Sequence, residues 1–104
     1  MPKAYFVVRA VVPDESRHAA FDHWYSTDHL PQAIAAFGAE KAWRFWSATD
    51  AAAHYAVYRF ADRDRIARAV GGDAMKALVA DFDRTWPGIA RTREILTMAE
   101  EVDG

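Results

Sequence analysis

Residues 40–60 read EKAWRFWSATDAAAHYAVYRF and contain two runs rich in aromatic residues, joined by a short connection. The runs cover 40–48 and 54–60, and strand-favouring Trp, Tyr, Phe and Val residues fill much of both. A connection of so few residues usually joins neighbouring antiparallel strands. The stretch therefore predicts a β-hairpin in the middle of the chain.

Strands and helical patterns flank this hairpin on both sides. Before it come a strand-like run at 5–12, a helical pattern at 14–25 and a second short helix at 29–37. After it come a helical region at 62–86, capped by Asp62 and broken at Gly71-Gly72, and a last strand at 91–99. The order βαββαβ predicts a ferredoxin-like α+β fold, with a four-stranded antiparallel sheet and helices on one face.

Length and composition bound the class of protein. The chain has 104 residues, of which 52% are hydrophobic and 13% aromatic, which excludes a disordered chain and fits a single domain over 1–104. There is no Cys and no apolar run long enough for a membrane helix. A net charge of -2 argues against nucleic-acid or membrane partners, and no RNP pattern is present. We expect a cytoplasmic protein.

Alternation along the strands assigns side chains to the two faces of the sheet, because purely apolar sets should face the helices. The residues expected on the helix side are Ala4, Phe6, Val8, Ala10, Val12, Trp43, Phe45, Ala56, Tyr58, Phe60, Leu96 and Met98. The residues expected on the opposite face are Tyr5, Val7, Arg9, Val11, Arg44, Trp46, Tyr55, Val57, Arg59, Arg93, Ile95 and Thr97.

The second of these faces is too apolar to be left in water, so we expect a second copy of the chain to cover it. This gives a homodimer through the sheet face, with an inner cavity. Its aromatic residues either pack the interface or line a ligand pocket. Its four arginines need carboxylates across the dimer or an anionic ligand, and Arg9, Trp46 and Tyr55 would suit an aromatic carboxylate or phenolate.

The stretch 21–31 reads FDHWYSTDHLP and is the part of the sequence richest in candidate functional residues. It resembles the F-x-x-W-(Y)-x-x-x-H-x-P pattern of the EthD-like branch of the dimeric α+β barrel superfamily. The matching residues are Phe21, Trp24, Tyr25, His29 and Pro31. The resemblance implies the fold and the dimer over essentially the whole chain. The superfamily includes monooxygenases acting on quinol-like aromatics, heme-degrading enzymes, lactone isomerases and polyketide cyclases, so the reaction stays open.

His29 is the candidate catalytic residue, because an imidazole can act as acid or base near neutral pH. We expect it at the start of the second helix, after a break capped by Ser26, Thr27 or Asp28, where the positive helix end favours the neutral ring. The structural alternative is that His29 binds the loop and fixes Pro31. Asp28 either orients the imidazole or caps the helix.

The remaining candidate residues have both structural and functional interpretations. Trp24 suits core packing, whereas Tyr25 can contact a ligand through its hydroxyl. His18 and His23 are five positions apart and do not share a helix face, and His54 has no evident partner. We therefore expect no metal and no cofactor.

Three functions remain in competition. The first is a cofactor-free enzyme of the monooxygenase, isomerase or cyclase type, in which His29 moves a proton on a small aromatic or polyketide-like compound and Arg9, Tyr25, Trp46 and Tyr55 bind it. The second is a heme-binding protein of the same fold with His29 as axial ligand. The third is a non-catalytic dimeric ligand-binding or interaction module.

Overall fold

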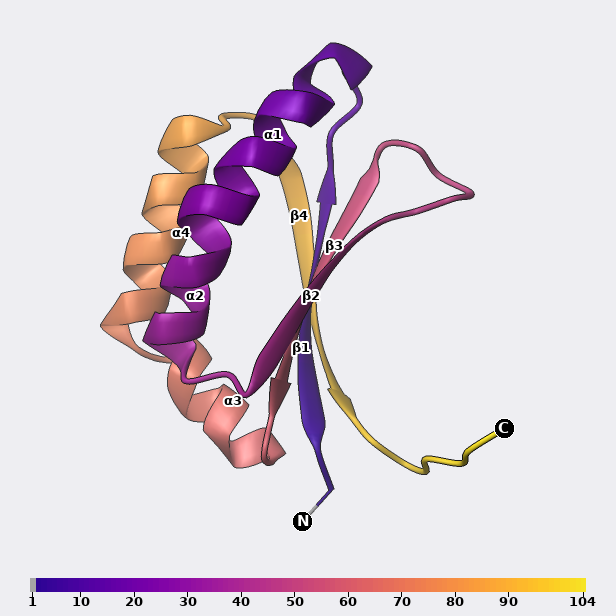
Figure 1. Cartoon of the computed structure of the whole chain (residues 1–104). Helices are drawn as coiled ribbons and strands as arrows, with labels where there is room; N and C mark the ends of the chain where they lie inside the picture. The colour runs from indigo at the N-terminus through magenta and orange to yellow at the C-terminus, as the bar shows by residue number, and fades with distance from the viewer. Residues whose placement is uncertain (1) are drawn as a thin grey trace.

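One four-stranded antiparallel sheet, in the order β2-β3-β1-β4, carries all the helices on one face (Figure 1). The structure is a computed structural model and describes residues 2–104. Its elements are β1 (Ala4–Val11), η1 (Glu15–Arg17), α1 (His18–Trp24), η2 (Tyr25–His29), α2 (Leu30–Phe37), β2 (Lys41–Trp46), β3 (Ala53–Phe60), α3 (Arg63–Val70), α4 (Asp73–Thr85) and β4 (Ala90–Thr97). The predicted ferredoxin-like fold is confirmed. No helix within these residues is long and apolar enough to cross a membrane.

The first helical region differs from the prediction, because α1, η2 and α2 form one continuous helix instead of two helices with a break. The middle part, η2, is a π-helical turn, and its neighbour Leu30 closes it with a hydrogen bond from its backbone N–H to the Tyr25 carbonyl. Asp28 makes no capping bond, so the expected caps were wrong. The widened turn lies directly before Pro31, whose ring would clash with the Thr27 carbonyl in a regular α-helix. Gly38, with a φ of 70°, ends the helix.

The hairpin and the second helical region follow the predictions. β2 and β3 pair antiparallel from Lys41 opposite Arg59 to Trp46 opposite His54. α3 and α4 are separated at the predicted glycine pair, and the Asp62 side chain caps α3 by accepting a hydrogen bond from the backbone N–H of Arg65 at 3.0 Å.

The faces of β1 and β3 are as predicted, but the register corrects the face of β2. Residues that pair across an antiparallel sheet project to the same side. Arg44 pairs with Ala56 and Trp46 with His54, so Arg44 and Trp46 face the helices. Trp43 and Phe45 consequently lie on the open face. The prediction was wrong because Asp22 of α1 provides a carboxylate that binds both Arg44 and the Trp46 indole on the helix side.

The face of β4 is corrected in the same way. Arg93 pairs with Val8 and Ile95 with Phe6, so both lie on the helix side, together with Thr97, whereas Leu96 lies on the open face. Met98 lies just beyond β4 and continues the alternation of Leu96. β4 is an edge strand bordered by a cleft on its helix side, so Arg93 keeps access to water there.

The core lies between the helices and the sheet and is unusually aromatic. Its largest fully buried side chains include Tyr25, Tyr58, Phe21, Phe60 and Phe82. Trp24 packs against this cluster, as expected, with its ring 5.4 Å from that of Phe82. The candidate site described below therefore packs against the aromatic residues on the helix side of the sheet.

Candidate functional site

The π-helical turn η2 places both Tyr25 and His29 in the interior. Tyr25 is 1% exposed and His29 is 8% exposed. The His29 imidazole stacks on the Trp24 indole, with ring centroids 4.8 Å apart and an interplanar angle of 19°. Tyr25 meets the same imidazole edge-on at 4.9 Å, and Nδ1 of His29 is buried without a hydrogen-bond partner. Two neighbouring residues of the same helix, Trp24 and Tyr25, thus fix the orientation of the imidazole.

Burial keeps His29 neutral at physiological pH. Desolvation lowers the pKa of His29 to about 4; Asp81 works against this shift, and Arg91 adds to it. The continuous helix leaves no free N-terminus at His29, so the helix-end explanation expected from the sequence was wrong and burial takes its place. Burial also raises the pKa of Tyr25 to about 12, so this phenol is not a base at neutral pH. The proton acceptor of the pair is His29.

A cleft of about 480 Å³ opens between β4 and the α3–α4 pair; we call it the β4–α4 cleft. It is lined by Phe6, Val70, Met75, Val79, Arg93, Glu94 and Ile95. A smaller hollow of about 20 Å³ shares Met75, Val79 and Arg93 with it, and is lined further by His29, Phe37, Leu78 and Arg91. His29 and Arg91 therefore border a small hollow next to the apolar cleft, and Arg93 lines both.

These two guanidinium groups are held differently. Arg91 has a side chain that is 10% exposed, forms an ion pair with Asp83 and lies 3.8 Å above the centre of the Phe82 ring. Arg93 is exposed and has no ion-pair partner anywhere in residues 2–104. Arg91 is thus part of the wall, whereas Arg93 is free to meet a ligand.

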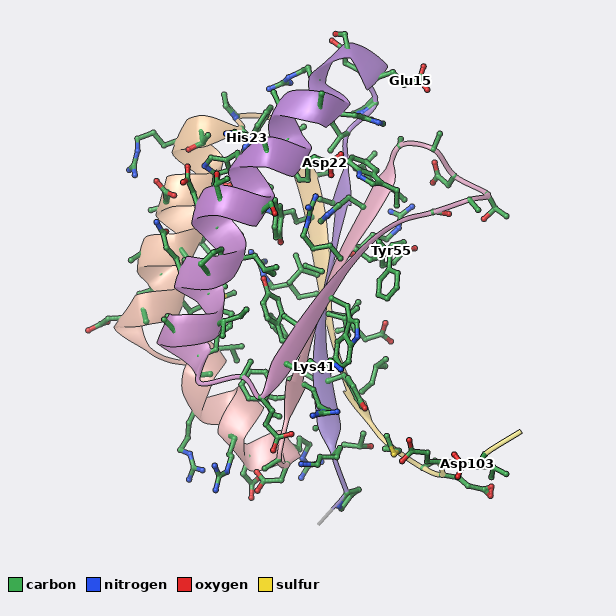
Figure 2. All side chains as sticks on the ribbon, viewed as in Figure 1. Glu15, Asp22, His23, Lys41, Tyr55 and Asp103 are labelled. Carbon is green, nitrogen blue, oxygen red and sulfur yellow. The ribbon has the colours of Figure 1, made fainter. Side chains whose placement is uncertain are left out.

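The residues predicted to bind substrate do not form one pocket. Arg9 and Tyr55 lie on the open face, where Arg9 Nε donates to the Tyr55 hydroxyl at 3.2 Å and Arg9 Nη2 binds Asp50 at 3.0 Å. Figure 2 shows Tyr55 on the side of the sheet that faces away from the helices. Trp46 and Tyr25 lie on the helix side. A common pocket of Arg9, Trp46 and Tyr55 was therefore wrong, since the sheet separates them.

A second polar cluster lies beside Tyr25 and was missed by the sequence reasoning. His54 is fully buried, and its Nε2 accepts a hydrogen bond from Nε of Arg44 at 3.1 Å. Arg44 also pairs with Asp22, which accepts a hydrogen bond from the Trp46 indole at 2.8 Å. Burial lowers the pKa of His54 to about 4.

The sequence contained a signal for this cluster. His54 continues the buried alternation of Ala56, Tyr58 and Phe60, which places it on the helix side of β3. Its ring centroid lies 4.7 Å from that of Tyr25, so Tyr25 separates two neutral histidines, His54 and His29.

The surroundings of His29 do not fit a haem. The hollow beside the imidazole measures about 20 Å³, far less than a haem occupies, and Nδ1 of the ring is fully buried. Across residues 2–104, no three His, Asp or Glu side chains lie close enough together to hold a metal ion.

Comparisons with known proteins support the fold. No protein-family model matches the chain, and no curated protein matches it in sequence. Solved structures do match. A variant of SnoaB, a cofactor-independent oxygenase from Streptomyces nogalater, is 13% identical with a TM-score of 0.73, and the match covers 100% of both chains.

Two further structures agree with this one. An EthD family protein from Bacillus halodurans is 18% identical over 96% of this chain and 99% of its own, with a TM-score of 0.70. A protein from Caulobacter crescentus, named provisionally as an antibiotic biosynthesis monooxygenase, is 22% identical over 95% of this chain and 92% of its own, with a TM-score of 0.64. The chain shares the ferredoxin-like α+β fold of these structures. At such identities the likeness extends to the fold and not to the reaction.

Proposed function

We propose that the chain is a small-molecule enzyme that works without a cofactor on an aromatic or polyketide-like compound in the β4–α4 cleft. The observation that supports this most directly is a neutral, buried His29 that borders a small hollow next to an apolar cleft, with Arg93 lining both. The description of SnoaB as a cofactor-independent oxygenase supports the same class of reaction.

The first step is removal of a proton. The free lone pair of the His29 imidazole takes a proton from an acidic C–H or phenolic O–H, which leaves an imidazolium ion and a carbanion or phenolate. The positive charge of Arg93 stabilises the anion, and the apolar walls strengthen this interaction by excluding water. Burial keeps His29 unprotonated at pH 7, so its lone pair is available for this step. The same burial makes the imidazole a weaker base, so the step depends on stabilisation of the anion.

The fate of the anion decides the reaction type. In an oxygenase, the carbanion transfers electrons to O2 as co-reactant, a C–O bond forms, and loss of water from the hydroperoxide leaves a carbonyl. In an isomerase, the proton returns at another carbon, and in a cyclase, the carbanion attacks a carbonyl of the same molecule. We place the oxygenase first because of the neighbour SnoaB.

Proton removal can be measured without knowing the product. The test incubates the protein in D2O with phenols, aromatic ketones with an acidic CH2 such as anthrone, and unsaturated lactones. Deuterium incorporation is followed by NMR and O2 uptake with an electrode. For a compound that reacts, His29→Gln should lower the exchange rate about 100-fold, within the usual range for a general base. His23→Gln is the matched control, because His23 lies on the same continuous helix and is exposed.

Two outcomes would contradict this function. If His29→Gln exchanges protons as fast as the unaltered protein, His29 is not the base. If compounds bind in the cleft but none exchanges a proton, the chain is a ligand-binding module and not an enzyme.

We also propose that the chain forms a homodimer through the open face of the sheet. The centre of this face is apolar, with Tyr5, Val7, Trp43, Phe45, Val57 and Leu96, and Phe45 is 52% exposed. Exposed apolar surface of this kind is typical of protein interfaces. The dimer would leave the β4–α4 cleft accessible, since the cleft lies on the other side of the sheet. Sedimentation equilibrium tests this assembly.

A further inference from the structure

We propose that Arg93 is the binding site for the carboxylate of a flat, apolar monoanion in the β4–α4 cleft. The proposal rests on the cleft of the proposed function and names the class of ligand that the cleft selects. It depends on binding alone, so it can be tested without any reaction.

The contrast between Arg91 and Arg93 is the first argument. Both project to the helix side of β4, because Arg91 pairs with Ala10 and Arg93 with Val8. Arg91 is almost fully buried, paired with Asp83 and stacked on Phe82, so its charge is already compensated. Arg93 has no carboxylate partner among the described residues and lines both the cleft and the hollow. A planar guanidinium with free N–H donors can bind a carboxylate through two parallel hydrogen bonds.

The position of Arg93 is the second argument. It belongs to both the cleft of about 480 Å³ and the hollow beside His29, so it lies where the two meet. A carboxylate held there leaves the rest of the ligand against apolar walls such as Val70, Met75 and Val79. A rigid aromatic skeleton packs against such walls at low entropic cost.

The apolar lining of the cleft is the third argument, since it limits the charge of the ligand. Glu94 pairs with Val7, so its side chain projects to the open face, and apart from Arg93 the side chains on the walls of the cleft are apolar. A second carboxylate on the ligand would be desolvated there without a partner, and Arg91 is not free to bind it. The cleft therefore selects a monoanion over a dianion of the same skeleton.

The test measures binding of three naphthalenes of the same skeleton to the full chain by NMR titration of the 15N-labelled protein. These are 2-naphthoate, 2-naphthalenemethanol and 2,6-naphthalenedicarboxylate. We expect 2-naphthoate to bind at least about tenfold more tightly than the neutral alcohol, as a charge-assisted hydrogen-bond pair provides. The dianion should bind no more tightly than 2-naphthoate, and shifts should be largest for β4 and α4.

Two variants separate a specific contact from a general effect of charge. Arg93→Gln should weaken binding of 2-naphthoate about tenfold and leave the alcohol unchanged. Arg68→Gln removes the same charge from an exposed arginine of α3 that lines a different hollow, and it should change neither. Because Arg93 is exposed, its replacement should leave the fold intact, which the 15N spectrum itself reports.

Three results would overturn the proposal: equal affinities for 2-naphthoate and the alcohol, an unchanged preference in Arg93→Gln, or an equal loss in Arg68→Gln. The proposed catalytic function fails by a different route, through unaltered proton exchange in His29→Gln. His29→Gln should keep its preference for 2-naphthoate, so the two failures are distinguishable.

Discussion

The two faces of the sheet carry similar residues but differ in whether every arginine has a carboxylate partner. On the open face, Arg9 binds Asp50, and Arg59 and Lys3 both bind Glu40. On the helix side, Arg44 and Arg91 are also paired, but Arg93 has no partner among the described residues, and the neutral imidazole of His29 borders the same hollow. A face whose arginines are all paired and whose centre is apolar suits docking of a second protein surface. A face with an unpaired cation and a buried base suits a small reactive ligand.

The largest effect should come from the two buried histidines of the helix side when the pH falls. The pKa of His29 and of His54 is about 4 in the folded chain and about 6.5 when unfolded. As the pH falls, both histidines therefore become protonated in the unfolded chain before they do in the folded chain. The stabilisation that comes from keeping these histidines neutral is fully present above pH 6.5. As the pH falls from 6.5 to 4, the free energy of unfolding decreases by about 3 kcal/mol for each histidine.

Urea unfolding between pH 4 and pH 8 measures this loss. His29→Gln should remove roughly half of the pH-dependent part, and His54→Gln a similar share, whatever each substitution does to stability at pH 8. The exposed His23 serves as the control, because His23→Gln should leave the change of the free energy of unfolding with pH, here called the slope, unaltered. A slope that persists in the double variant of His29 and His54 would show that other groups cause it.

The next effect tests which face carries the chemistry. His29→Gln should slow deuterium exchange about 100-fold, equivalent to about 3 kcal/mol of transition-state stabilisation. Tyr55→Phe removes only the hydroxyl that accepts the Arg9 hydrogen bond on the open face and should leave the rate unchanged. A loss in Tyr55→Phe comparable to that in His29→Gln would place the reaction on the open face, as the sequence had suggested.

A smaller effect should follow from a charge placed on the open face. Phe45→Glu introduces a carboxylate into the proposed interface and should weaken self-association at least about tenfold, since burying an unpaired charge is costly. Lys76→Glu, on the exposed surface of α4, is the control. Sedimentation equilibrium measures the strength of self-association for both variants. A chain that is monomeric before any substitution would contradict the homodimer.

The fold could be predicted from the sequence because local signals agree with tertiary structure. Strand patterns, the Gly71-Gly72 break and the Asp62 cap each depend on neighbours within a few residues, and all were correct. The π-turn at η2 could not be predicted in the same way. The polar run 26–28 looks like a helix break, yet the helix continues through it because the chain on either side packs on the sheet.

The candidate site could be predicted only in part. His29 and Tyr25 were found through a local motif, and the structure places both on the helix side. The face on which each arginine lies was harder to predict, because alternation shows which residues share a face but not which face meets the helices. In β2, Asp22 of α1 determines which residues face the helices. In β4, the cleft beside this edge strand determines it. Both are contacts between distant segments, which spacing within one strand does not report.

The smallest effect should be seen when a balanced pair on the open face is removed. Arg9→Gln breaks the bonds to Asp50 and Tyr55, both of which lie at or near the surface. Partly exposed ion pairs contribute at most about 1 kcal/mol, so the free energy of unfolding should fall by less than that. Binding of 2-naphthoate should not change, because Arg9 lies across the sheet from the cleft. Urea unfolding and the NMR titration measure both quantities on one sample. If Arg9→Gln weakened 2-naphthoate binding as strongly as Arg93→Gln, the anion would bind on the open face, and the difference between the two faces would have been assigned the wrong way round.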